Sequence, residues 1–153
     1  MLTKSKSQTQ KFAAKLAKKI LRKGTGRKAS ILALSGDLGA GKTTFTQGFI
    51  KALGVKHHVT SPTFLIVRRY PLGSLKSKVE SRKFLNAYHF DLYRIHSVGE
   101  LISLNFKKIL NDPQNIVLLE WPERIGKSLP KSAHWIRFEH GKKQKERIIK
   151  VKF

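Results

Sequence analysis

The chain of 153 residues contains no cysteine and only 9 acidic residues. The absence of cysteine excludes disulfide bonds and thiolate metal sites, so the chain tolerates a reducing compartment. No apolar run approaches the roughly 20 residues that a helix needs to cross a bilayer. We therefore expect a cytoplasmic protein with no membrane contact.

The first 30 residues lack acids altogether and also lack the continuous apolar core of a secretory signal. A basic, acid-free start is also typical of a transit peptide. The apolar residues Phe12, Leu16 and Ile20, however, recur at helical spacing. This pattern predicts a helix over about 8–23 that packs on the rest of the domain, and a cleaved leader is the alternative.

Basic residues dominate the composition, with 32 Lys and Arg giving a formal net charge of +23. Such an excess predicts strong, salt-sensitive attraction to polyanions. The cations are spread out: ten precede residue 29, six lie between Arg68 and Lys83, and seven follow Ile136. A generally basic surface and a dedicated nucleic-acid surface are therefore both open.

The length fits one domain over residues 1–153. Helices and strands are expected to alternate in the first half, and strands to gather toward the end. Helices are predicted at 8–23, from the glycine loop to Gly54, and at 98–110; strands at 30–35, 63–70, 84–95, 116–120, 134–140 and 146–153; and an exposed basic loop at 71–83. This order predicts an α/β sandwich with a mixed sheet.

The stretch GDLGAGKT matches a phosphate-binding loop between a strand and a helix. Glycines allow consecutive N–H groups to turn inward, and the following helix start favours negative charge. Lys42 is expected to reach the β- and γ-phosphates and Thr43 to bind Mg²⁺. The candidate nucleotide-binding residues in this segment are Gly36, Asp37, Leu38, Gly39, Ala40, Gly41, Lys42, Thr43 and Thr44.

Two acids stand where strands are predicted to end, Asp91 in HFDLYR and Glu120 after IVLL. A phosphate loop needs such an acid to anchor its metal ion. The alternatives are a surface residue for Glu120, and a cap or a salt bridge with Arg94 for Asp91. His89 shares a predicted strand face with Asp91. A histidine there is more often packed than catalytic.

The stretch Thr60-Ser61-Pro62-Thr63 is either an ordinary turn or a segment that senses the γ-phosphate. Trp121, followed by a proline, is most often a packing residue. The guanine-reading motifs of common GTPases are absent from the sequence. Their absence favours ATP over GTP.

Four motifs in this order, GDLGAGKTTF, TSPTF, YHFDLYRI and LLEWPERI, resemble the bacterial TsaE family, also known as YjeE. The resemblance implies a P-loop NTPase-like sandwich and the ATPase subunit that supports threonylcarbamoylation of adenosine 37 in tRNA. It implies that the subunit acts with a TsaB and TsaD heterodimer and has low activity alone. ATP and Mg²⁺ are the implied cofactors.

The resemblance also assigns roles to individual residues. Lys42, Asp91 and Glu120 fall on catalytic positions, and Thr43, Glu120 and Asp91 on positions linked to the metal ion. Further positions of the nucleotide site are matched by Thr9, Ser61, Thr63 and Trp121.

Three features depart from the family pattern: Asn105 stands where a glycine is expected, the basic loop 71–83 is long, and the charge is high. The charge leaves direct contact with tRNA open. The rival functions are a small-molecule kinase of the P-loop type and a basic RNA-binding module with weak ATPase activity. Against a kinase, the candidate lid 71–83 lies between strands and not between helices.

Overall fold

The computed structural model describes residues 1–56, 58–62, 64–72 and 84–152. Most of the predicted basic loop 71–83 and the candidate residue Thr63 lie outside the described residues. Among the described helices, none combines the length and the apolar character needed to cross a membrane.

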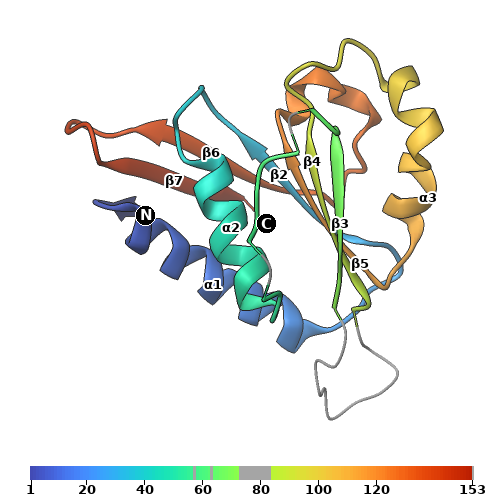
Figure 1. Ribbon diagram of the computed structural model, residues 1–153, viewed down its shortest axis with the longest axis horizontal. Helices are drawn as coiled ribbons and strands as arrows, with labels where there is room; N and C mark the ends of the chain where they lie inside the picture. Colours follow the sequence, from blue (N-terminus) through green and yellow to red (C-terminus); the bar gives the residue numbers. More distant parts are fainter. Residues whose placement is uncertain (57, 63, 73–83, 153) are drawn as a thin grey trace.

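A seven-stranded sheet forms the centre of the molecule, in the order β1-β7-β6-β2-β5-β4-β3 (Figure 1). The strands are β1 (Leu2–Thr3), β2 (Ser30–Ser35), β3 (Val67–Pro71), β4 (Asn86–Asp91), β5 (Asn115–Glu120), β6 (His134–His140) and β7 (Arg147–Lys152). β2 runs parallel to β5 and β6, and β4 runs parallel to β5. The outer pairs β1–β7, β6–β7 and β3–β4 are antiparallel, so the predicted mixed sheet is confirmed.

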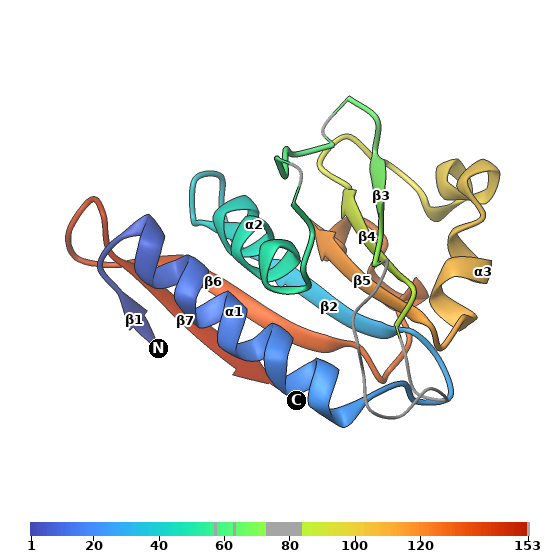
Figure 2. The same ribbon diagram turned by 60° about the horizontal axis from the view of Figure 1, so that its bottom comes forward.

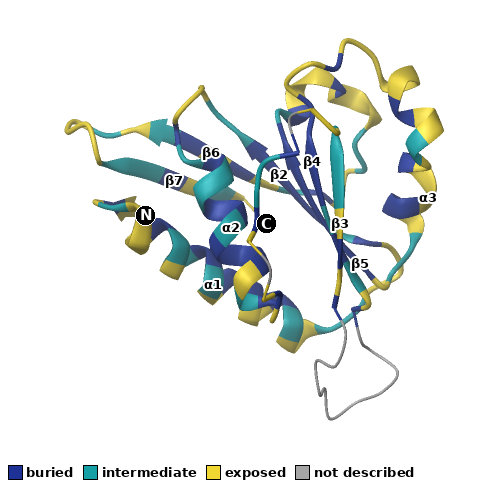
Figure 3. Ribbon diagram, in the orientation of Figure 1, coloured by how far each residue is buried: buried dark blue, intermediate teal, exposed yellow. Residues whose placement is uncertain are grey.

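Helices cover both faces of the sheet (Figure 2). α1 (Lys6–Lys23) and α2 (Lys42–Ala52) pack together over one face, and the 3₁₀ helix η2 (Val98–Leu104) with α3 (Phe106–Asn111) packs over the other. Successive residues of a strand alternate between the two cores: Leu32 and Leu34 face α1 and α2, and Ile31 faces α3. The alternation explains why β2 and β5 are buried on both faces (Figure 3).

Local signals set the limits of α1. The side chain of Ser5 accepts a hydrogen bond from the backbone of Gln8, which caps the first turn. Gly24 ends the helix at a positive φ of 73°. The helix spans the predicted range 8–23 and begins two residues earlier, because the cap is at Ser5.

Three predicted elements need correction. The strand expected at 63–70 begins only at Val67, since Ile66 adopts a φ of 62° that breaks the extended chain. The strand expected at 84–95 spans Asn86–Asp91 and ends where Asp91 bonds the turn that follows. The helix expected at 98–110 is divided by Asn105 at a φ of 54°, a left-handed position that asparagine adopts more readily than most other residues do.

The remaining short elements lie near the edges of the sheet. β1 was not predicted, because two residues carry no periodic signal. It forms by pairing with β7, where Leu2 lies opposite Ile148. The 3₁₀ turns η3 (Pro122–Arg124) and η4 (Gly126–Ser128) follow β5.

Candidate nucleotide-binding site

The glycine loop connects the end of β2 to the start of α2, as predicted. Gly36 has a φ of 137°, and a Cβ there would collide with the carbonyl of Phe138. Gly41 is the N-cap of α2 with a φ of 102°, and no side chain in the described residues caps this helix start. The first turn of α2 therefore keeps its N–H groups for an anion.

Lys42, the first residue of α2, has only 4% of its surface exposed. Its Nζ donates hydrogen bonds to the backbone carbonyls of Gly36 and Asp37 and lies 3.8 Å from the ring centroid of Trp121. Burial lowers the pKa of Lys42, and Glu120 is the strongest of the acids that oppose this effect. A phosphate placed in the loop would supply a stronger partner than either carbonyl does.

Glu120 is the centre of a buried hydrogen-bond network. Thr43 donates from Oγ1 to Glu120 Oε2 at 2.9 Å. His89 Nε2 lies 2.8 Å from Glu120 Oε1, and the Thr46 hydroxyl is 3.5 Å from the same oxygen. Since Glu120 is 2% exposed, the alternative of a surface residue at the end of the strand is wrong.

Asp91 lies directly beside Glu120, because the two residues are partners in the parallel β4–β5 pair. Ser61 donates from Oγ to Asp91 Oδ2 at 2.8 Å, and the backbone N–H of Tyr93 donates to Asp91 Oδ1 at 3.1 Å. The capping role weighed for Asp91 is therefore present, together with a link to Ser61. The guanidinium of Arg94 lies over the ring of Phe64, 4.8 Å from its centroid.

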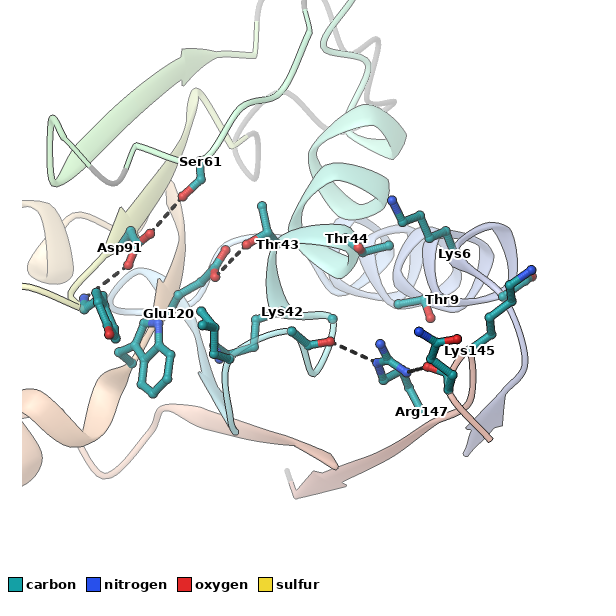
Figure 4. A pocket seen from close by; sticks show the side chains of 17 residues that line it. Lys6, Thr9, Lys42, Thr43, Thr44, Ser61, Asp91, Glu120, Lys145 and Arg147 are labelled. Carbon is teal, nitrogen blue, oxygen red and sulfur yellow. Dashed lines mark hydrogen bonds between the residues drawn. The ribbon is translucent and has the colours of Figure 1, made fainter. Parts of the chain in front are cut away.

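A pocket of about 930 Å³ is lined by Lys42, Thr43, Ser61, Asp91 and Glu120, among other residues (Figure 4). Of the predicted site residues, the pocket brings together Thr9, Leu38, Gly39, Gly41, Lys42, Thr43, Thr44, Ser61, Asp91, Glu120 and Trp121. Gly36, Asp37 and Ala40 belong to the loop but do not line the pocket. Residues predicted from separate motifs thus line a single cavity at the carboxyl ends of β2, β4 and β5.

One end of the pocket was missed by the motifs. This end is lined by Ser5 and Lys6 at the start of α1 and by Gln144, Lys145 and Arg147 from the β6–β7 hairpin. Tyr93, which lines another part of the pocket, was also missed. Arg147 donates from Nε to the carbonyl of Gly39 at 3.1 Å, which ties this hairpin to the glycine loop. No sequence motif marks these residues, because only the pairing of distant strands places them beside the loop.

The donor set fits a magnesium nucleotide. Mg²⁺ is commonly held by one or two carboxylates and a hydroxyl, with phosphate oxygens and waters completing the octahedron. Thr43 at the start of α2 supplies the hydroxyl, and Glu120 and Asp91 at the ends of β5 and β4 supply the carboxylates. In the described part of the chain, no group of three or more His, Asp or Glu side chains is arranged to hold a metal ion by itself.

A strand, a glycine loop and a helix, with buried carboxylates on the neighbouring strands, define a P-loop NTPase-like fold. The crystal structure of Bacillus subtilis YdiB supports this class: it is 28% identical in sequence, has a TM-score of 0.69, and the match covers 99% of this chain and 82% of that one. The profile of the family described as Threonylcarbamoyl adenosine biosynthesis protein TsaE matches residues 3–149. The chain belongs to the TsaE family.

Several curated relatives carry the name tRNA threonylcarbamoyladenosine biosynthesis protein TsaE. The Haemophilus influenzae protein is 36% identical over 130 residues, which are 85% of this chain and 75% of that protein. The Rickettsia prowazekii protein is 38% identical over 122 residues, 79% of this chain and 72% of that protein. The Bacillus subtilis protein is 40% identical over 100 residues, but the match spans only 55% of its length.

Proposed function

We propose that this chain binds ATP with Mg²⁺ and hydrolyses it in the biosynthesis of threonylcarbamoyladenosine in tRNA. The observation that carries the proposal is the bond from Thr43 to Glu120 at 2.9 Å, beside the buried Lys42. It joins the start of α2 to the end of β5, where a phosphate loop requires a hydroxyl and an acid for the metal ion. The family membership supports the pathway.

The nucleotide would extend along the whole pocket. The glycine loop and Lys42 bind the triphosphate, so the nucleoside lies at the other end, among Thr9, Gln144 and Arg147. Mg²⁺, when bound, neutralises charge on the phosphate oxygens. Thr43 and Glu120 would hold the ion, directly or through a bound water.

Hydrolysis breaks the bond between the γ-phosphorus and the bridging oxygen as a water oxygen attacks. Asp91 orients this water and accepts its proton, since its carboxylate lies beside Glu120 at the end of the sheet. Ser61 bonds Asp91 and would move with the state of the γ-phosphate. Among the described residues, no arginine lines the pocket near Asp91 to stabilise the charge of the transition state. We therefore propose low activity until TsaB and TsaD bind.

Turnover of ATP by the purified chain, with and without TsaB, TsaD and tRNA, tests this function. We expect slow hydrolysis alone and clear stimulation by the two proteins. Lys42→Ala should abolish nucleotide binding while the circular dichroism spectrum is unchanged. If well-folded protein shows no heat of association with magnesium and ATP in titration calorimetry, the proposed function is wrong. Transfer of phosphate to a small acceptor would instead support a kinase.

A further inference from the structure

A row of cations follows the outward side of α1. Lys11, Lys15, Lys18 and Arg22 are spaced by four, three and four residues, which places them along one side of the helix. All four are exposed, whereas the opposite side of α1 is buried (Figure 3). We call these four residues the basic ridge. At 1.5 Å per residue, it extends over roughly 16 Å.

No acid within the described residues neutralises the basic ridge. The chain has no acidic residue before Asp37, and no side chain of the four ridge residues makes a hydrogen bond or ion pair with another described residue. The scarce acids are placed elsewhere: Asp91 and Glu120 line the pocket, and Glu139 pairs with Arg137 and Lys150. Like charges this close on a helix repel one another, so a bound polyanion would relieve the repulsion.

The positive potential extends beyond the ridge toward the sheet. The pKa of His134, at the start of β6, is lowered first by burial and then by the charges of Lys23 and Lys19. These two lysines are exposed in the last turns of α1. The cationic surface therefore continues from the ridge toward the start of β6.

The chemistry of the ridge fits RNA better than a membrane or a protein. A helix that lies on a membrane inserts its apolar side, but Leu16 and Ile20 of α1 are buried in the core of this protein. The ridge also lacks the apolar centre typical of a protein interface. Phosphate backbones, by contrast, are bound chiefly by exposed Lys and Arg.

We propose that the basic ridge of α1 binds the phosphate backbone of tRNA. This inference rests on the proposed function for the identity of the RNA, but it concerns a surface outside the nucleotide pocket. α1 begins at the pocket, where Ser5, Lys6 and Thr9 line it, and the ridge extends away from there toward the C-terminal end of the helix. A bound tRNA would lie beside the pocket without entering it.

The test compares two variants of equal charge. The ridge variant combines Lys11→Gln, Lys15→Gln, Lys18→Gln and Arg22→Gln. The control combines Lys107→Gln, Lys108→Gln, Lys127→Gln and Lys131→Gln, four exposed positions on α3 and in the segment after β5. The affinity of the full chain for an unmodified tRNA transcript is measured by fluorescence anisotropy over a series of salt concentrations. ATP turnover of each protein is measured in parallel.

We expect the ridge variant to lose at least tenfold in affinity and to reduce the slope of log K against log salt by about 3. The control variant should keep most of the affinity for tRNA and most of the salt dependence. Equal losses in the two variants would show that net charge alone binds RNA and would overturn the proposal. So would binding of polyglutamate, or of vesicles containing phosphatidylserine, with the same affinity and the same dependence on the ridge.

The outcomes for RNA and for ATP are separable. Because the ridge does not line the pocket, the ridge variant should retain the ATP turnover of the unchanged protein. Loss of RNA binding with intact turnover supports the inference. Intact RNA binding in the ridge variant refutes it, whatever the turnover is. Absence of turnover in all three proteins counts against the proposed function and leaves the comparison of RNA affinities valid.

Discussion

His89 Nε2 and Glu120 Oε1 lie 2.8 Å apart, with His89 completely buried and Glu120 only 2% exposed. The two residues come from neighbouring strands, β4 and β5. His89 Nδ1 has no hydrogen-bond partner among the described residues, so a ring that carries its proton on Nε2 and donates to Glu120 accounts for both nitrogens. His89 therefore fixes one carboxylate oxygen and leaves the other to Thr43.

His89→Leu should misplace the carboxylate of Glu120 but leave the nucleotide pocket able to bind. We expect the apparent affinity for Mg²⁺, measured by titrating the metal against bound ADP, to weaken by about 10 to 100-fold. Binding of ADP without metal should change little, because His89 does not line the pocket. His89→Gln, which keeps a donor, should restore part of the affinity. Tyr88→Phe is the control, since Tyr88 packs in the other core. Unchanged metal affinity in His89→Leu would mean that the histidine only fills space.

Asp91→Asn should separate binding from hydrolysis. The amide keeps the size of the carboxylate but cannot accept a proton from water. We expect ATP affinity within a few-fold of the unchanged protein and turnover lowered by about 10² to 10⁴. Single-turnover measurements with TsaB and TsaD present would detect the loss. If Asp91→Asn hydrolyses ATP normally, Asp91 serves only to hold Ser61 and the turn at Tyr93.

Most of the regular elements and the half of the pocket formed by the glycine loop were predictable from the sequence. The strand predicted at 30–35 is β2, residue for residue, because an apolar run is bounded there by polar residues and by the glycine loop. Asp91 and Glu120 were identified because each is an acid directly after apolar strand residues. That the two acids lie side by side follows from the register of β4 and β5. No local sequence pattern contains this register.

The other half of the pocket could not be predicted, because it depends on contacts between the ends of the chain. β1 is two residues long and exists only by pairing with β7. That pairing and the packing of α1 on α2 place Lys6 and Arg147 at one pocket. The division of residues 98–110 at Asn105 depends likewise on one backbone conformation, which the helical pattern of apolar residues does not reveal.

Gly48→Ala should destabilise the protein although alanine is the better helix former. A Cβ on Gly48 would lie 2.5 Å from Gln10 Cα and 2.7 Å from Gln10 O, so the backbone of α1 must move. The gain in helix propensity is about 1 kcal/mol. Overpacking against backbone costs about 1–3 kcal/mol or more, so the net free energy of unfolding should fall.

Urea denaturation measures this change, with Gly99→Ala as the control because the nearest atom to its Cβ would be Ser97 Oγ at 3.5 Å. ATP affinity should fall in Gly48→Ala as well, since α1 carries Thr9 and α2 carries Lys42 to the same pocket. If the stability of Gly48→Ala equals that of the unchanged protein, α1 and α2 can move apart to admit the Cβ without loss of stability.

Glu100 should make stability depend on pH in the acidic range. Its Oε1 accepts hydrogen bonds from the backbone N–H groups of His96 and Ser97, at 2.8 and 2.9 Å. These bonds, that from His96 first, lower the pKa of Glu100 below its ordinary value of 4.5. The folded state therefore favours the ionised form. Its contribution to stability is complete above 4.5 and is lost as the pH falls through the lowered pKa.

Glu100→Gln removes this dependence. The free energy of unfolding, measured in urea from neutral pH down to about pH 3, should be lower in the variant at neutral pH, and the difference should shrink on acidification. Glu123→Gln controls for the loss of one negative charge from this basic chain. A difference that stays constant over the whole range would show that the two backbone bonds do not favour the carboxylate over the neutral acid, and that Glu100 acts on the start of η2 by its shape alone.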